Sequence, residues 1–83
     1  MTQIVLIIAY MLNHGGITNK QAMQIGVGRL SARIGELRAM GIGIDTIPIF
    51  VTKHNGKLVR IGKYVFHSEE SGKLAYERFV KVA

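Results

Sequence analysis

The spacing of apolar residues at the start of the chain predicts a helix over residues 2–13. Apolar residues recur there at the three- and four-residue intervals of a helix: Ile4, Ile7, Ile8, Met11 and Leu12. Gly15 and Gly16 follow as a stop signal. Isoleucine and valine would also suit a strand, but the length of the segment and its Gly-Gly ending favour a helix. Val5 and Leu6 extend the apolar surface, so we expect the helix to be covered on two sides.

Two shorter helices are predicted next, over residues 19–25 and 29–40. Thr18 is a suitable N-cap for the first, which offers the core Ala22, Met23 and Ile25. The second has an apolar face made of Leu30, Ile34 and Leu37, and Gly41 follows as a left-handed C-cap. Two short helices joined by a glycine-containing turn, here residues 26–28, are typical of a helix-turn-helix.

From residue 42 the apolar spacing changes to every second residue, which predicts a β-hairpin over residues 42–66. Pro48 marks the first strand as an edge strand, because proline cannot donate a ladder hydrogen bond. Asn55 and Gly56 predict a two-residue type I′ turn. Pairing outward from that turn sets His54 opposite Lys57, Lys53 opposite Leu58, Val51 opposite Arg60 and Ile47 opposite Tyr64.

A last helix is predicted over residues 69–82, with Ser68 as its N-cap and Glu69 and Glu70 in the first turn, where they complement the helix dipole. We expect it to pack on the core through Leu74, Phe79 and Val82, with Tyr76 beside them. A chain of 83 residues closes one core, so we expect a single domain over residues 1–83. The order of elements predicts an α+β, mostly α, winged helix-turn-helix fold, in which the hairpin is the wing.

The net charge of the chain narrows the class of partner that the protein is expected to bind. The chain has 11 Lys and Arg against five Asp and Glu, a net charge of +6. Residues 46–68 contain four basic residues and no acidic one, which suits a polyanionic partner. The absence of cysteine excludes disulfides and zinc thiolates and fits a reducing cytoplasm. The apolar run at residues 4–12 is about half of the ~20 residues of a membrane span, so we expect neither export nor a membrane partner.

Three sequence elements between residues 15 and 46 resemble a known family. They are GITNKQA at residues 16–22, GRLSARI at residues 28–34 and ELR at residues 36–38, with Gly41 and an Ile-x-Ile after them. They are similar to the small helix-turn-helix proteins common in bacteriophage and prophage genomes. That resemblance implies a winged helix-turn-helix fold, DNA binding, and the cytoplasm of a bacterial host cell. Gly35 departs from the family pattern, and a glycine there costs a helix about 1 kcal/mol relative to alanine.

The helix at residues 29–40 is the predicted reader of base edges, because the N-terminal part of a recognition helix enters the major groove. Arg29 and Arg33 are candidates for guanine or phosphate contacts. Ser31 could hydrogen-bond a phosphate or a base, and Ala32 could approach a thymine methyl group. The alternative for each arginine is a solvated surface charge or an ion pair with Glu36. Arg38, late in the helix, is expected to be structural.

Phosphate contacts are predicted from the helix before it and from the wing. Asn19 and Lys20 begin the helix at residues 19–25, and the amides of a helix N-terminus commonly meet a phosphate. The wing would add contacts that supply affinity without sequence information. Its candidates are Lys53, His54, Lys57, Arg60 and Lys63.

Catalysis is the least favoured class. His14, His54 and His67 are far apart with no carboxylate at ligand spacing, so no metal or other cofactor is expected. The glycines at residues 26–28 follow a helix and lack the third glycine of a dinucleotide-binding loop. The sequence predicts a non-catalytic double-stranded DNA-binding protein, a phage or prophage regulator. The alternative is a winged-helix interaction module, such as a phage-encoded inhibitor of a host or defence protein. Charge on both the recognition helix and the wing favours DNA.

The first helix also predicts a homodimer. A helix at the edge of a small domain should have a polar face, yet residues 4–12 contain no charged residue. A second copy would hide that apolar surface. It would also set two recognition helices about 34 Å apart on a palindromic site. The alternative is that the C-terminal helix covers this face within one chain.

Overall fold

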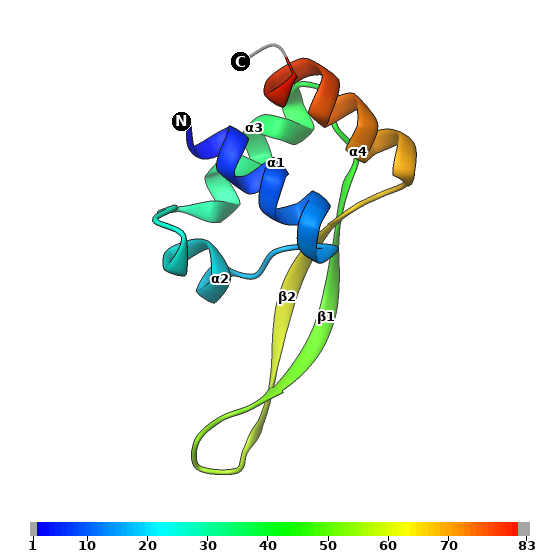
Figure 1. Cartoon of the computed structure of the whole chain (residues 1–83). Coiled ribbons are helices and arrows are strands. Elements are labelled where there is room, and N and C mark those ends of the chain that lie inside the picture. The colour runs from blue at the N-terminus through cyan, green and yellow to red at the C-terminus, as the bar shows by residue number, and fades with distance from the viewer. Residues whose placement is uncertain (1, 82–83) are drawn as a thin grey trace.

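The computed structural model describes residues 2–81, in which a compact group of helices carries a projecting hairpin (Figure 1). The elements are α1 (Gln3–His14), α2 (Asn19–Gln24), α3 (Leu30–Ala39), β1 (Ile44–Thr52), β2 (Leu58–Phe66), α4 (Glu69–Ala75) and the π-helical turn η1 (Tyr76–Val80). The hairpin makes the molecule elongated, at 44 × 24 × 21 Å. The predicted α+β fold, three helices, a hairpin wing and a C-terminal helix, is confirmed.

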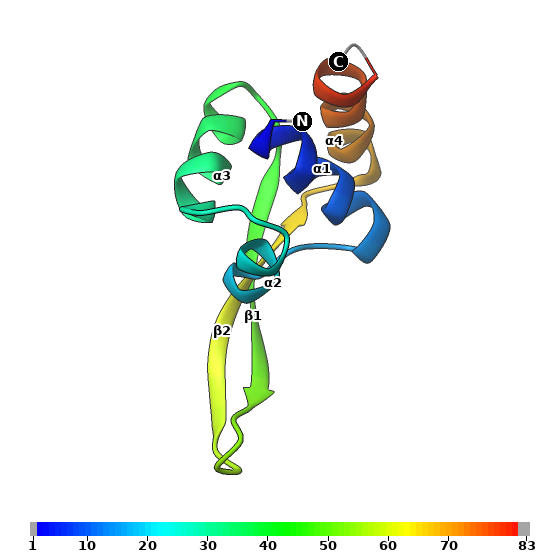
Figure 2. The same cartoon turned by 60° about the vertical axis from the view of Figure 1, so that its left-hand side comes forward.

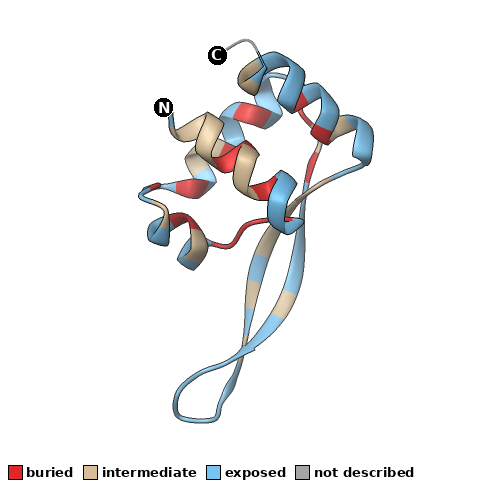
Figure 3. Ribbon diagram, viewed as in Figure 1, coloured by how far each residue is buried: buried red, intermediate tan, exposed pale blue. Residues whose placement is uncertain are grey.

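The core lies where the helices meet, and most of the hairpin lies outside it (Figure 3). Helix α1 lies between α3 and α4, so it is covered on two sides as its sequence predicts (Figure 2). Its fully buried residues are Ile7, Ile8 and Met11, and those of α3 are Leu30, Ile34 and Leu37. Burial of such aliphatic side chains, about 1.5–3 kcal/mol each, is the main force that holds the helices together.

The predicted N-caps are confirmed, and one helix start is not. Thr18 and Gln21 form a capping box at α2, because each side chain accepts a hydrogen bond from the other residue's backbone N–H, at 3.3 and 3.0 Å. Ser68 accepts from the N–H of Ser71 at α4. The helix predicted over residues 29–40 covers Leu30–Ala39 instead, since Arg29 precedes it in a left-handed conformation, φ 55° and ψ 51°.

The predicted register of the hairpin is wrong by one residue. Val51 pairs with Val59 instead of Arg60, and Ile47 pairs with Lys63 instead of Tyr64. The N–H of Lys53 donates to the carbonyl of Lys57, and that of Gly56 donates to the carbonyl of Lys53. Gly56 has φ +83° whereas Asn55 has a negative φ, so the loop is a type I turn followed by a left-handed glycine. A three-residue loop of this kind shifts every pair relative to a two-residue type I′ turn.

A one-residue bridge, which the sequence pattern does not reveal, helps to join the hairpin to the helices. Ile17 forms an antiparallel bridge with Tyr64, and each N–H donates to the other's carbonyl at 2.9 Å. Ile17 therefore acts as a one-residue third strand beside β2, and it is fully buried. Gly16, next to it, is packed so closely that a Cβ there would lie 2.7 Å from the carbonyl oxygen of Tyr64.

The C-terminal helix packs on the core through Phe79, as predicted, and otherwise through residues that the sequence did not single out, while Tyr76 is exposed. Gly72 and Ala75 are buried, Phe79 is half-buried, and Leu74 is exposed. A Cβ on Gly72 would lie 3.3 Å from the side chains of Leu12 and Phe66, so the small residues let the helix approach closely, and Leu74 falls outside that face. After Ala75 the hydrogen bonding becomes π-helical, with the N–H of Lys81 donating to the carbonyl of Tyr76. Val82 lies outside the described residues.

We expect Gly16→Ala to lower the free energy of unfolding by about 1–3 kcal/mol, the usual cost of overpacking. Its Cβ would meet a backbone oxygen that cannot move without breaking the bridge between Ile17 and Tyr64. Urea denaturation followed by circular dichroism measures the change. Gly28→Ala is the matched control, because a Cβ at Gly28 meets nothing within 4 Å. Equal stabilities for the two variants would contradict this account of Gly16.

Candidate nucleic-acid interface

The outer face of α3 consists mostly of residues with small side chains. Ser31 and Gly35 are exposed, and Ala32 is half-buried. A Cβ on Gly35 would meet nothing within 4 Å, so no close contact within the chain requires glycine there. An alanine at this position would favour the helix by about 1 kcal/mol. A helix surface without long side chains at its centre can approach a groove closely, as the predicted roles of Ser31 and Ala32 require.

Arg33 lies beside this face and is partly committed to the protein. One of its terminal nitrogens contacts the Glu36 carboxylate at 2.9 Å, and its side chain is 30% exposed. Its Nε is buried and has no hydrogen-bond partner among the described residues. The ion pair predicted as an alternative role is therefore present. A partly exposed i,i+3 pair contributes little stability, so Arg33 can exchange Glu36 for a stronger anion at little cost.

Arg29 stands at the N-terminus of α3 in an unusual conformation. It is the one residue other than glycine with a positive φ among residues 2–81. Its side chain makes no capping bond to the helix, and the residue is exposed. A left-handed conformation in a non-glycine residue costs free energy and usually has a reason in packing or function. Arg29 thus provides an exposed basic residue immediately before the first turn of the predicted recognition helix.

Two other arginines are structural. The guanidinium of Arg38 donates twice to the carbonyl of Ile44, at 3.0 and 2.8 Å, and once to the hydroxyl of Thr46. It also lies over the ring of Tyr64, 5.8 Å from the centroid. Arg78 donates to the carbonyl of Met40, just past the end of α3. The structural role predicted for Arg38 is confirmed, whereas Arg78 was not singled out by the sequence.

The structure brings three predicted contact residues together in a hollow between α2 and the wing. Lys20 comes from α2, and Lys53 and His54 come from the tip of the hairpin. The hollow has a volume of about 730 Å³, and its other polar lining residues are Thr18, Gln21, Gln24 and Thr52. Asn19 is exposed at the start of α2. Cations from two elements that are far apart in the chain thus share one concave surface.

The remaining wing residues lie elsewhere. Arg60 lines a smaller hollow on the hairpin with Thr46, Pro48 and Gly62. Lys63 is half-buried, and its stem packs so near Gly16 that a Cβ on that glycine would come within 2.7 Å of its Cε. Lys57 is exposed at the turn, where its N–H donates to the side chain of Asn55. The wing candidates therefore do not form one patch.

Comparison with known families decides how these parts are interpreted. A family described as the winged helix-turn-helix domain matches residues 2–69. The chain belongs to this family. No curated protein and no solved structure matches the chain. A winged helix-turn-helix domain indicates DNA binding, and within it α2 and α3 are the helix-turn-helix and the hairpin is the wing.

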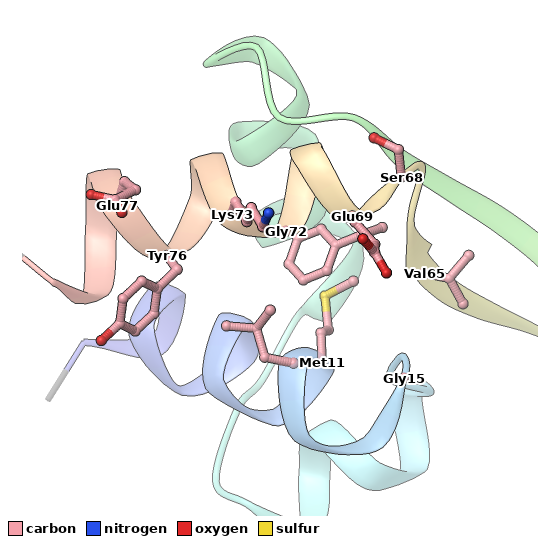
Figure 4. A pocket seen from close by; sticks show the side chains of 11 residues that line it. Met11, Gly15, Val65, Ser68, Glu69, Gly72, Lys73, Tyr76 and Glu77 are labelled. Atoms are coloured by element: carbon pink, nitrogen blue, oxygen red, sulfur yellow. The ribbon is translucent and has the colours of Figure 1, made fainter.

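The described residues of this winged helix-turn-helix protein give little support for a metal site or a membrane span. Residues 2–81 contain no group of three or more His, Asp or Glu placed to hold a metal ion. His67 instead contacts Asp45 at 2.9 Å. None of the described helices has the length and apolar character to cross a membrane. An open groove of about 600 Å³ lies between α1 and α4, lined by Met11, Tyr76, Glu69 and Glu77 among others (Figure 4).

We expect Arg38→Ala to lower the free energy of unfolding by about 1–3 kcal/mol, because it leaves the carbonyl of Ile44 without both of its guanidinium donors. Arg60→Ala should change stability by less than about 0.5 kcal/mol, since Arg60 is exposed and forms no ion pair with a described residue. Thermal and urea denaturation measure both. The assignment fails if the two variants are equally stable.

Proposed function

We propose that the protein binds double-stranded DNA without catalysis, as a phage or prophage regulator of transcription in the cytoplasm of a bacterial host. Helix α3 would enter the major groove, and α2 and the wing would contact phosphates. The observation that carries the proposal is the division of the basic residues. Nine of the eleven have no ion pair among the described residues, and six of these flank α3 or lie along the wing: Lys20, Arg29, Lys53, Lys57, Arg60 and Lys63. The other three are Arg38 and Arg78, which donate to backbone carbonyls, and Lys73 on α4.

Basic side chains without an ionic partner are the ones most available to bind a polyanion. A lysine or arginine already held by a carboxylate must lose that partner before it binds phosphate, whereas a solvated cation only releases counterions from the DNA. Arg38 and Arg78, which are held by backbone carbonyls, both act near the C-terminal end of α3. The opposite end, where a recognition helix reads base edges, has Arg29 free and Ser31 exposed.

Base contacts are assigned to the first half of α3. Arg29 would contact guanine or phosphate, and Ser31 would hydrogen-bond a phosphate or a base. Ala32 would approach a thymine methyl group. Arg33 would exchange its pair with Glu36 for a guanine or a phosphate. Asn19 would join Lys20 in holding a phosphate at α2.

DNA binding should weaken steeply with salt, because each phosphate contact releases about one counterion. Fluorescence anisotropy with labelled fragments of the source genome at several salt concentrations measures the slope of log affinity against log salt. The double variant Lys20→Ala with Lys53→Ala should reduce the magnitude of the slope by about two. Lys81→Ala removes the same kind of charge just after η1, the segment that lies at the end of the molecule opposite the wing tip (Figure 1), and should leave the slope unchanged. Absence of binding at low salt would refute the proposed function.

Arg33→Ala should weaken specific binding by about 1–3 kcal/mol and relax specificity at one base position without unfolding the domain. Selection from a randomised duplex library measures the specificity. Leu30→Ala is the contrasting variant, since truncating this buried side chain should cost about 2–5 kcal/mol of stability. If Arg33→Ala melts the protein and leaves the affinity for DNA unchanged, the face of α3 has been assigned wrongly.

We also propose a homodimer, on a revised surface. Helix α4 and η1 cover much of α1 through Ala75, Phe79 and Val80, which favours cover within one chain. What stays exposed borders the groove of Figure 4: Leu12 is 44% and Tyr76 is 43% exposed. Lys73 and Glu77 line the same groove, so two copies related by a two-fold axis would pair lysine with glutamate if Glu77 exchanges its exposed pair with Lys81, at 3.3 Å, for the new one.

Sedimentation at micromolar concentration tests the dimer. The expected result is a particle of twice 9.2 kDa, and Tyr76→Ala should shift the equilibrium toward the monomer because it removes the apolar surface of the groove. Asn13→Ala, an exposed change beside the groove, is the control. A wild-type protein that stays monomeric with and without DNA would exclude the homodimer and leave the DNA-binding proposal standing.

A further inference from the structure

The wing exposes two large apolar side chains that its fold does not need. Phe50 is 68% exposed and Leu58 is 69% exposed. Phe50 pairs with Arg60, and Leu58 pairs with Thr52, which is two residues from Phe50. Residues two apart on a strand share a face, so Phe50 and Leu58 are diagonal neighbours on one face, and Arg60 lies directly beside Phe50 on that face.

No other part of residues 2–81 covers this face. Every residue from 50 to 58 is exposed, and the hairpin extends away from the helices (Figure 3). The surroundings are basic, since residues 46–68 contain Lys53, Lys57, Arg60 and Lys63 and no acidic residue. Adjacent exposed apolar side chains usually mark a contact surface. By the same alternation Arg60 shares this face with Phe50, whereas Lys63, which pairs with Ile47, lies on the opposite face.

The size and charge of this surface favour DNA over a protein. A specific protein interface buries about 800 Å² on each partner, far more than two side chains provide. A cation beside the apolar pair, here Arg60 opposite Phe50, fits the phosphates that line a groove. A narrow two-stranded hairpin with an apolar tip face also has the shape of the wedges that architectural proteins insert between base pairs from the minor groove.

We infer that the wing inserts Phe50 between two base pairs from the minor groove, with Leu58 packed beside it and Arg60 on the adjacent phosphates. The inference rests on the proposed DNA binding. Insertion partly unstacks one base step and bends the duplex. Pyrimidine–purine steps unstack most easily, so the wing would select a TA or CA/TG step without hydrogen-bonding to its bases. Specificity at that position would come from the deformability of the DNA.

The test uses the full chain and a duplex of about 30 base pairs with a central TA step. The adenine of that step is replaced by a fluorescent analogue that brightens when it is unstacked. Donor and acceptor dyes on the duplex ends report bending. The wild type should brighten the analogue and shorten the end-to-end distance. Phe50→Ala should abolish the brightening, reduce the bend and weaken binding about tenfold. Its melting temperature should stay unchanged, since Phe50 is exposed.

Two controls separate insertion from general loss of affinity. Leu74→Ala removes an exposed apolar side chain from α4 and should behave as the wild type. Arg60→Ala should weaken binding yet keep the brightening at saturating protein.

If the wild type binds the duplex and Phe50→Ala matches it in brightening and bend, insertion is wrong while DNA binding stands. If the wild type binds no duplex at low salt, both the insertion of Phe50 and the proposed DNA binding are wrong. Self-association that Phe50→Ala abolishes, without brightening in the wild type, assigns this face to a protein contact and overturns insertion.

Discussion

The placement of the wing depends on the short bridge between Ile17 and Tyr64. Two backbone hydrogen bonds of 2.9 Å join the segment before α2 to β2. Gly16 allows this approach because it has no Cβ. On the same strand, the ring of Tyr64 lies under Arg38, which also holds the start of β1 through the carbonyl of Ile44. One residue of β2 therefore connects the hairpin to both helices of the helix-turn-helix.

The sequence predicts the elements well because their signals are local. Apolar periodicity, the caps at Thr18 and Ser68 and the glycine stops each act within a few residues. The register of the hairpin depends on the conformation of Asn55, and the same Asn-Gly pair suits both a type I′ turn and a type I turn followed by a left-handed glycine. The left-handed Arg29 and the single paired residue Ile17 have no periodic pattern that could have revealed them.

Predicting the candidate site is harder because it depends on which cations are already engaged. Arg78 and its acceptor Met40 are 38 residues apart, so no spacing rule links them. Two of the five arginines, Arg38 and Arg78, donate from a planar guanidinium to a backbone carbonyl. The lysines of the hairpin have no such fixed partner among the described residues. The exposure of Phe50 was also beyond the sequence, because alternation on a projecting hairpin does not tell which face the body covers.

Pro48 has a consequence for how the hairpin behaves in a crowded solution. Since the N–H of Lys53 points to β2, alternation turns the N–H positions of the even-numbered residues of β1 toward the open edge. An open strand edge is a template on which another chain can add a strand. Pro48 stands in the middle of that edge and has no hydrogen to donate, so a continuous ladder cannot form across it. The protein can thus extend a long, apolar hairpin into solvent with a built-in barrier to aggregation through β1.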